Sequence, residues 1–590
     1  MELSIMDRYH RMDDNSLQQD PSHSMVLSPV MTSDELDAYL MKMYQYYYQK
    51  GFTCILVEKI ANLLIYLFMV AFVVFWVSFV NYSALFNVST ETPFSKVIDI
   101  SASKIAVITW IISCGMLLFW VLNVVQFIRD LPELFQIREY YLKVLRIPDI
   151  NHVDWNFVAG RIIESSSRLG SSMNEESPLL PVITTINQYK LNEINIAARI
   201  LRRDNYIVAM FNHNIFKLSV YTKPMEWFLT YAVWNYLFDP IHRETIRPEL
   251  LKREDRQLHT AELRNRMMVC GIVFFILSPV IVMYLLVYYL FAYFDQIRNT
   301  PAILSGRLWS RYALWKFREF NELSHYFDSR LAKSQEPADK YLSQFPSRLL
   351  PILGQLVSFM AAAFFIVILL LGFISDDTLL QVTVFDRSLL YYVGIFGIIL
   401  TATRGLISND AELPEHQKYL LQVSEFTHYR PKCWIKAHEK VALDELKSLY
   451  QYRLVVFLQS MMTVLTGPFI LLFRLPAEAE HIVEFIQDFT VYDDNLGYIC
   501  SAAAFEHLES HGNVKYGAPV SAPKNHRTKH GKMEKSMITF KQNHPQWQPP
   551  ESARKLLDNV REYLELSEET NKKPPNMIKS LYTLHDSVRI

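Results

Sequence analysis

Six apolar stretches, separated by polar segments, set out the architecture that the sequence predicts. The first is residues 60–80, where Asn62 is the one polar residue of consequence. At about 1.5 Å per residue, a helix over this stretch is long enough to cross the hydrocarbon core of a bilayer. Residues 105–128, 349–373 and 389–406 have the same character, so the pattern predicts four transmembrane helices.

Two further apolar stretches contain proline. Residues 269–294 carry Pro279 near their middle, and residues 454–473 carry Gly467 and Pro468. Because proline has no backbone N–H donor, both stretches are predicted to contain a helix break, at Pro279 and at Pro468. Each stretch is therefore either a kinked span or a re-entrant helix whose irregular backbone is buried in protein or lines a wet cavity.

The distribution of Lys and Arg decides between these alternatives. Residues 374–388 contain a single cation, whereas residues 295–348 contain nine and residues 407–453 contain seven. Cytosolic loops are richer in positive charge than translocated loops, yet six crossings would translocate both cation-rich segments. The charges therefore favour four spans, two re-entrant helices and cytosolic termini. The predicted fold is an all-α polytopic membrane protein.

This topology divides the chain into membrane segments and cytosolic regions. Two loops, 81–104 and 374–388, are predicted to be lumenal. The first holds glycosylation sequons at Asn81 and Asn87, and Asn87 is the better candidate because Asn81 adjoins the membrane. The other predicted regions are a disordered arm (1–33), a lead-in and two spans (34–128), cytosolic helical regions (129–268, 295–348 and 407–453), two spans with their loop (349–406), a packing segment (474–520), and a mostly disordered tail (521–590) with a short helix near 553–566.

Composition and motifs exclude several classes of function. Apolar residues make up 51% of the chain, more than one soluble core requires, and a net charge of −1 gives no basic field for nucleic acid. The five cysteines lie far apart without zinc-ligand spacing, so free thiols and no metal site are predicted. No glycine-rich phosphate loop, HExxH helix or GxSxG elbow occurs, so no cofactor and no enzyme class is indicated.

The N-terminal arm holds one short targeting candidate. Tyr9 and Met12 fit a tyrosine-based sorting signal of the form Tyr-x-x-apolar, which would bind clathrin-adaptor complexes. The alternative is a chance tetrapeptide in a flexible segment.

Polar residues at membrane depth are the strongest functional signal. Arg404, with Thr401 and Thr403, lies near the end of the fourth predicted span. A charge in hydrocarbon costs several kcal/mol unless it faces a partner or water, so Arg404 is a candidate cavity-lining cation. The alternative is that its side chain extends to the cytosolic headgroups. Arg298 and Arg307 follow the first proline-containing stretch and would extend a cationic entrance suited to anionic lipid heads.

Residues 314–331 repeat apolar side chains at helical spacing and place Arg318 four residues before Glu322, which predicts a cytosolic amphipathic helix with an ion pair. The same segment closely resembles the signature of the autophagy-related protein 9 family. The resemblance extends over roughly residues 35–520. Its signature residues here are Trp315, Lys316, Phe317, Arg318, Glu319, Phe320, Asn321, Glu322 and His325.

The resemblance implies a homotrimer of domain-swapped protomers and an ATP-independent phospholipid scramblase without nucleotide hydrolysis. It places the protein on preautophagosomal membrane and on Golgi- and endosome-derived vesicles. A bridge-type lipid-transfer protein and membrane phospholipids are the implied partners. By position, the family's pore-lining residues match Arg298, Thr401 and Arg404.

Two other classes of function remain as alternatives. One is a non-transporting scaffold that delivers vesicles and recruits autophagy factors, with the polar residues packed inside the protein. The other is an ion channel or secondary transporter, which is disfavoured because the four clean spans contain no Asp or Glu.

Overall fold

The computed structural model of the chain describes residues 33–80, 107–169, 185, 189, 191–218, 220–238, 245–299, 306–345, 349–374, 376–385, 387–404, 415–435, 440–512, 523, 526–551 and 553–558. The sorting-signal candidate Tyr9 and Met12 and the sequons at Asn81 and Asn87 lie outside the described residues.

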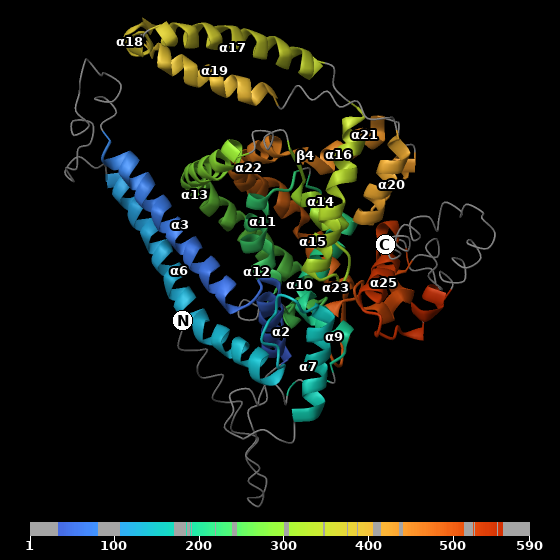
Figure 1. The fold of residues 1–590 in the computed structure, drawn as a ribbon. Coiled ribbons are helices and arrows are strands. Elements are labelled where there is room, and N and C mark those ends of the chain that lie inside the picture. The colour runs from blue at the N-terminus through green and yellow to red at the C-terminus, as the bar shows by residue number, and fades with distance from the viewer. Residues whose placement is uncertain are drawn as a thin grey trace, which may run out of the picture.

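Helices dominate the described part of the chain (Figure 1). Five helical stretches are long and apolar enough to cross a membrane, and α19 (Leu389–Arg404) contains a shorter apolar helix. The five stretches are Phe52–Trp76, Cys114–Val144, Arg256–Tyr289, Ile352–Phe373 and Arg453–Asp488. The polytopic all-α character is therefore confirmed, whereas the division into four spans and two re-entrant helices stays a prediction.

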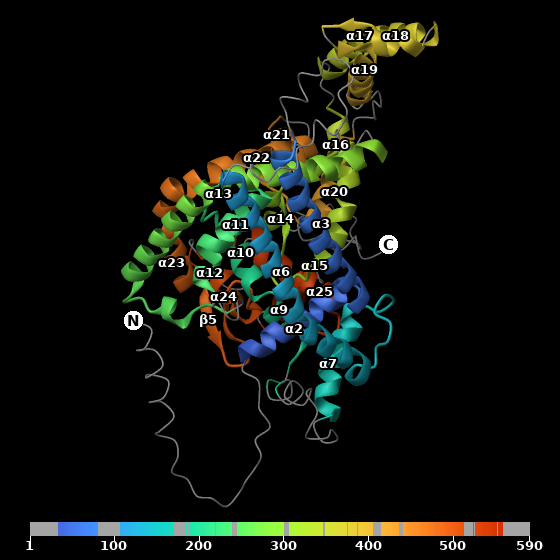
Figure 2. The ribbon, with the colours of Figure 1, turned by 90° about the vertical axis from the view of Figure 1, so that its left-hand side faces the viewer.

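The first two predicted spans form an antiparallel pair, α3 (Phe52–Ser78) and α6 (Val107–Glu139), which lie side by side in Figures 1 and 2. The Trp120 indole N–H donates to the carbonyl of Leu63 at 2.9 Å, and Lys59 pairs with Asp130 at 2.8 Å. Helix α6 runs eleven residues beyond the predicted end at 128, so it continues from the apolar span directly into the body of the protein.

Pro279 does not break its helix, which corrects the sequence prediction. It lies inside α13 (Arg256–Asn299), a continuous helix of 44 residues. A proline at 279 leaves the carbonyl of Phe275 without its usual backbone donor. The Ser278 hydroxyl donates to that carbonyl at 2.9 Å, so the helix continues with the lost hydrogen bond replaced.

At Pro468 the helical geometry does change. Helix α22 (Arg453–Phe469) ends one residue later and continues as a π-helical turn, Ile470–Arg474. The backbones of α22 and α13 approach closely here, because a Cβ on Gly271 would lie 3.1 Å from the Pro468 carbonyl. The close approach of Gly271 to Pro468 therefore lets the two apolar helices pack tightly. The local sequence alone did not indicate this contact.

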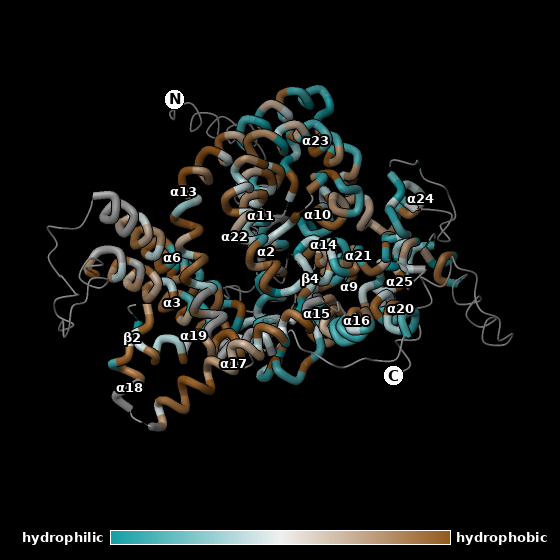
Figure 3. The backbone as a smooth tube through the Cα atoms, turned by 90° about the horizontal axis from the view of Figure 1, so that it is seen from above, coloured by the Kyte–Doolittle hydropathy of each residue, from teal (hydrophilic) through white to brown (hydrophobic). Residues whose placement is uncertain are grey.

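The third and fourth predicted spans form a separate hairpin. It consists of α17 (Leu349–Ile374), α18 (Asp376–Gln381), the paired strands β2 (Thr383–Val384) and β3 (Arg387–Ser388), and α19. Figures 1 and 2 show the hairpin standing away from the rest of the protein, and Figure 3 shows hydrophobic colouring along α13 and α17. Helices α17 and α19 pack on each other.

The remaining described elements form a helical body around three large hydrophobic cores and one small cluster. The antiparallel pair of β1 (Arg307–Trp309) and β4 (Tyr450–Tyr452) joins segments that are distant in sequence, whereas β5 (Thr490–Asp493) and β6 (Gly497–Cys500) form a local hairpin. All five cysteines are free thiols, as predicted. The body helices are α2 (Ser33–Tyr48), α7 (Trp155–Leu169), α9 (Glu193–Ile200), α10 (Arg202–His213), α11 (Lys223–Leu229), α12 (Asn235–Leu237), α14 (Arg311–Phe317), α15 (Ser324–Lys333), α16 (Gln335–Ser343), α20 (His416–Thr427), α21 (Lys440–Leu449), α23 (Ala479–Asp488), α24 (Leu508–His511) and α25 (Lys532–Asn543).

The C-terminal region differs most from the prediction. The sequence favours a mostly disordered tail from residue 521, yet α25 lies in the interior of the body, with every residue from Lys532 to Phe540 buried. The short helix expected near 553–566 is present over residues 553–558. Because the first four residues of α25 include two lysines and a glutamate, its sequence is typical of an exposed segment. Only the tertiary packing shows that these three residues are buried and that α25 is part of the core.

Candidate functional site

The family-signature segment is not one amphipathic helix, which corrects the prediction for residues 314–331. Helix α14 ends at Phe317, residues 318–323 form an extended turn, and α15 begins at Ser324. The Ser310 hydroxyl caps α14 by accepting from the Ala313 N–H at 3.2 Å. The two short helices therefore enclose a turn where the periodicity predicts continuous helix.

Side chains within the turn and from distant segments bind the backbone N–H groups of this turn. Within the turn, the Glu319 N–H donates to the Glu322 carboxylate oxygen Oε2 at 3.0 Å. The Phe320 N–H donates to the Ser536 hydroxyl at 3.0 Å, and the Asn321 N–H donates to the Asn205 side chain at 2.9 Å. Asn321 has a φ of 56°, a left-handed conformation that interrupts an α-helix and that Asn tolerates better than most residues.

The charges of the turn pair differently from the helical prediction. Arg318 contacts Asp204 at 3.1 Å rather than Glu322, so the expected i,i+4 pair is wrong. Glu322 instead pairs with Arg330 at 2.5 Å, and Glu319 lies 3.0 Å from His428. Burial by itself would raise the pKa of Glu319, but the facing charges of His428 and Arg330 hold that pKa below its usual range.

Three side chains of the segment 314–331 belong to three different cores. Phe317 packs in the core of α15, α16, α20 and α21, and Phe320 packs in the core that contains α10, α23 and α25. Leu323, which closes the turn, packs with α2, α7 and α9. In a continuous helix these side chains would lie along one face. The turn is therefore the local structure that lets one segment contribute to all three cores.

Two other signature residues form hydrogen bonds with neighbouring helices. The Trp315 indole N–H donates to Glu226 at 3.2 Å. His325 shares two hydrogen bonds with Tyr44 of α2: its backbone N–H donates to the Tyr44 oxygen at 3.1 Å, and the Tyr44 hydroxyl contacts its Nδ1 at 3.0 Å. Burial lowers the pKa of His325 to about 4, so the ring is neutral near pH 7. The signature segment is therefore an architectural centre of the body.

The predicted lipid-path residues lie at the ends of two membrane helices. Thr401 is half-buried on α19, and its hydroxyl donates to the Gly397 carbonyl of the same helix at 2.8 Å. Arg404 is the last residue of α19, and Arg298 is the next-to-last residue of α13; their side chains lie outside the described part of the structure. The structure therefore places these residues near the ends of their helices without describing a path that joins them.

Other hydroxyl groups in the apolar helices follow the pattern of Thr401. The hydroxyls of Thr403, Ser460, Thr463 and Thr466 each donate to a carbonyl one turn back, at 2.6–2.9 Å. Such bonds satisfy the donor within hydrocarbon while leaving the hydroxyl oxygen as an acceptor. These helices are therefore less polar than their sequence suggests.

Sequence reasoning missed a buried charge cluster on α2. Asp37 is fully buried between the guanidinium groups of Arg199 and Arg202, and it lies 2.5 Å from Arg202. The two arginines also donate to the carbonyls of Asn495 and Tyr498 in the β5–β6 hairpin. The available signal was an aspartate on the apolar face of α2, next to Leu36 and one turn before Leu40.

Comparison with known proteins agrees with this architecture. A family model described as "Autophagy protein ATG9" matches residues 30–506. Autophagy-related protein 9 of Dictyostelium discoideum is 32% identical over 93% of this chain and 79% of its own length. The Neurospora crassa protein of the same name is 31% identical over 87% of this chain, and the match spans 59% of its own length.

A solved structure shows the same similarity. The cryo-EM structure of Schizosaccharomyces pombe Atg9 matches with a TM-score of 0.58 and 28% identity, covering 80% of this chain and 99% of that one. The family model extends over the apolar helices and the signature turn, although it ends before α25. From its sequence, its helical membrane architecture and these matches, the chain belongs to the ATG9 family of autophagy proteins.

Proposed function

We propose that this protein is an ATP-independent phospholipid scramblase that moves lipids between the leaflets of vesicles which seed and expand the autophagosomal membrane. It works as a domain-swapped homotrimer with both termini in the cytosol. A bridge-type lipid-transfer protein delivers phospholipid to one leaflet, and scrambling redistributes it. Its location is the preautophagosomal membrane and Golgi- and endosome-derived vesicles, with clathrin-adaptor complexes as partners in sorting.

The α17–α19 hairpin is the observation that supports this proposal most directly. Phe359, Phe373 and Ile398 are 75%, 86% and 71% exposed, and the hairpin packs on itself away from the body. Such an apolar surface requires lipid or a second copy of the chain to cover it. A hairpin exchanged between protomers would place Thr401 and Arg404 beside the apolar helices of another copy.

Polar groups beside an open hydrocarbon surface supply the physical basis for lipid movement. A headgroup that crosses the bilayer in contact with water and polar side chains avoids most of its desolvation cost, while its acyl chains remain in lipid. Transport then follows the imbalance of lipid between the leaflets, so no nucleotide is consumed. In this proposal Arg298 and Arg404 attract the phosphate, and Thr401 offers its hydroxyl oxygen.

A second candidate function is a scaffold that delivers vesicles and recruits autophagy factors without moving lipid. The observation in its favour is that the hydroxyl groups of α19 and α22 donate to their own helices. Packed interior helices show the same arrangement, so these groups do not require a hydrophilic path.

A reconstitution assay separates the two functions. The full chain is placed in liposomes with fluorescent lipid in both leaflets, and dithionite is added outside in the absence of nucleotide. A scramblase lets the fluorescence fall well below half, whereas a plateau near half in sealed vesicles containing the trimer supports the scaffold. Ion leakage is recorded in parallel, because dithionite entry through a channel would also bleach the inner leaflet.

Matched variants then test the path. Thr401→Leu combined with Arg404→Leu is expected to slow lipid exchange. Thr466→Leu on α22 is the control, because Thr466 makes the same kind of own-helix bond, at 2.9 Å to Met462, on a different helix. Equal rates in a folded double variant and in the wild type would remove Thr401 and Arg404 from the path.

A further inference from the structure

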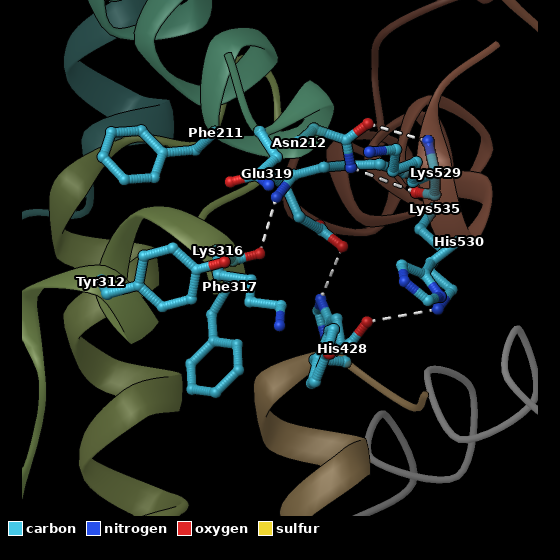
Figure 4. Close-up of a pocket in the computed structure, with 13 residues that line it drawn as sticks. Phe211, Asn212, Tyr312, Lys316, Phe317, Glu319, His428, Lys529, His530 and Lys535 are labelled. Carbon is cyan, nitrogen blue, oxygen red and sulfur yellow. Dashed lines mark hydrogen bonds and ion pairs between the residues drawn. The ribbon is translucent and has the colours of Figure 1, made fainter. Parts of the chain in front are cut away.

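A cavity of about 190 Å³ lies in the helical body, where three segments far apart in the sequence meet. Lys316 comes from α14, His428 follows α20, and Lys529, Lys532 and Lys535 come from the C-terminal segment (Figure 4). The cavity runs from an exposed rim, where Lys529 and His530 lie, to a buried floor.

The lining of this cavity is strongly cationic. Four lysines and two histidines line it, whereas Glu319 is the one carboxylate among the described lining residues. That carboxylate is already engaged by His428 at 3.0 Å, and the charge of Arg330 also acts on it. Glu445, outside the lining, lies 3.6 Å from Lys316 and offsets part of its charge. Glu322 and Glu534 also act on the floor lysines from outside the lining, where Arg330 and Arg430 oppose them. Among the lining residues themselves, the cations outnumber the carboxylates.

Three of the four lining lysines donate described hydrogen bonds to neutral acceptors. Lys532 donates to the carbonyl of Lys316 at 2.8 Å, and Lys535 donates to the carbonyl of His428 at 3.2 Å. Lys529, at the rim, donates to the carbonyl of His213 at 3.3 Å. A carbonyl satisfies one of the three donors of an ammonium group and does not neutralise its charge.

The two floor lysines are deeply buried. Lys532 is 7% exposed and Lys535 is 3% exposed, although lysine is almost never fully buried without a partner. Burial lowers the pKa of Lys532 to about 7 and that of Lys535 to about 8, partly offset by Glu319. Buried cations beside a solvent-reached cavity are stabilised most simply by an anion within it.

We propose that this cavity is a binding site for a phosphate group, held by Lys316, Lys529, Lys532 and Lys535. Its volume is below the range of about 300–1,000 Å³ usual for drug-sized ligands, so it suits a single phosphate group rather than a whole nucleotide. The four ammonium groups around one phosphate would form charge-assisted hydrogen bonds, each stronger than a bond to a carbonyl.

A bound phosphate would tie the C-terminal segment to the body. Lys532 and Lys535 belong to α25, whereas Lys316 belongs to α14 and His428 to the end of α20, so the anion would bridge all three. The group can come from a soluble phosphate compound or from a phosphorylated lipid headgroup, since both present the same chemistry. In either case the site stabilises the position of α25 beneath the signature turn.

The test measures thermal unfolding of the full chain in phosphatidylcholine nanodiscs. Inorganic phosphate is titrated against chloride at equal pH and ionic strength. A ligand that binds the folded state raises the melting temperature with the logarithm of its concentration, so phosphate is expected to produce a rise that chloride does not. A wild-type chain that melts at the same temperature in both salts overturns the proposal.

Variants on one helix provide the matched control. Lys532→Met with Lys535→Met is expected to abolish the phosphate-dependent rise, and in chloride it melts at or above the wild-type temperature because two buried charges are gone. Lys541→Met, also on α25 but outside the cavity lining, is expected to keep the rise. Loss of the rise in Lys541→Met as well would overturn the site assignment.

Two additional arms complete the design. Lys529→Ala, at the exposed rim, tests the site without a buried substitution, and its phosphate affinity is expected to fall about tenfold through loss of one charge-assisted bond. Unchanged affinity in this variant would contradict the proposed set of ligands. Nanodiscs containing phosphatidylinositol 4-phosphate, without free phosphate, identify the source: a Lys532- and Lys535-dependent rise there assigns a lipid headgroup, and a rise with inorganic phosphate alone assigns a soluble ligand.

Discussion

Replacing Asp37 by alanine tests how the body holds its first helix. The Asp37 carboxylate lies between Arg199 and Arg202, and none of the three side chains is more than 1% exposed. Asp37→Ala would remove the carboxylate that lies between two buried guanidinium groups. Breaking a buried ion pair by removing one partner costs about 3–5 kcal/mol, because the remaining charge stays desolvated.

The effect should be concentrated where the arginines make their other bonds. Arg199 and Arg202 donate to carbonyls of Asn495 and Tyr498, so the β5–β6 hairpin is expected to open more often in Asp37→Ala. A loss of 3 kcal/mol corresponds to roughly a hundredfold or greater rise in the open population. Amide hydrogen exchange of peptides covering residues 490–500, followed by mass spectrometry, measures that population directly.

An exposed ion pair on the same helix provides the control. Lys42 of α2 pairs with Glu133, and the two side chains are 43% and 53% exposed. Such pairs contribute about 0–1 kcal/mol, so Lys42→Ala should change exchange little. If Asp37→Ala and Lys42→Ala accelerate exchange equally, the buried cluster does not stabilise the body in the way described.

Three further predictions concern packing, pH and the C-terminal segment. Gly467→Ala places a Cβ 2.4 Å from the Phe228 ring, so it should destabilise the chain by about 1–3 kcal/mol in thermal unfolding, whereas Gly394→Ala, with nothing within 4 Å, should not. Burial lowers the pKa of His325 and His544 to about 4, so the unfolded chain binds protons more readily than the folded chain between pH 6.5 and 4. The melting temperature should therefore fall as the pH is lowered across that window, and it should fall less in His544→Gln. An unchanged dependence of the melting temperature on pH in His544→Gln would contradict the assignment. Deleting residues 523–590 uncovers the turn at 318–323, so trypsin is expected to cut at Arg318 in the shortened chain but not in the full chain. Equal resistance of both chains to trypsin would show that α25 does not cover the turn.

Part of the fold was readable from local pattern. The apolar stretches, the wide spacing of the cysteines and the signature residues are properties of the sequence itself, and they gave the all-α membrane architecture and the family. Length and hydropathy are sufficient here because a bilayer demands a continuous apolar helix wherever the chain lies in it.

The structure changed the predictions that depended on partners distant in sequence. Pro279 was expected to break a helix, but the Ser278 hydroxyl replaces the lost donor and α13 continues. Residues 314–331 have helical periodicity, yet Asn205 and Ser536 bind the backbone N–H groups of the turn and divide the segment. Periodicity reports which side chains share a face, and it does not report which backbone groups are bound by other segments.

The sequence by itself determined which segments are apolar enough for a membrane and which family the chain resembles. Tertiary structure alone decided that the signature turn joins three cores, that Asp37 holds two arginines, and that a lysine-bearing C-terminal helix lies in the interior. The physical reason is that a charged or irregular segment is favourable inside a protein only when specific partners satisfy it. Those partners are brought together by the fold and cannot be read from neighbouring positions in the chain.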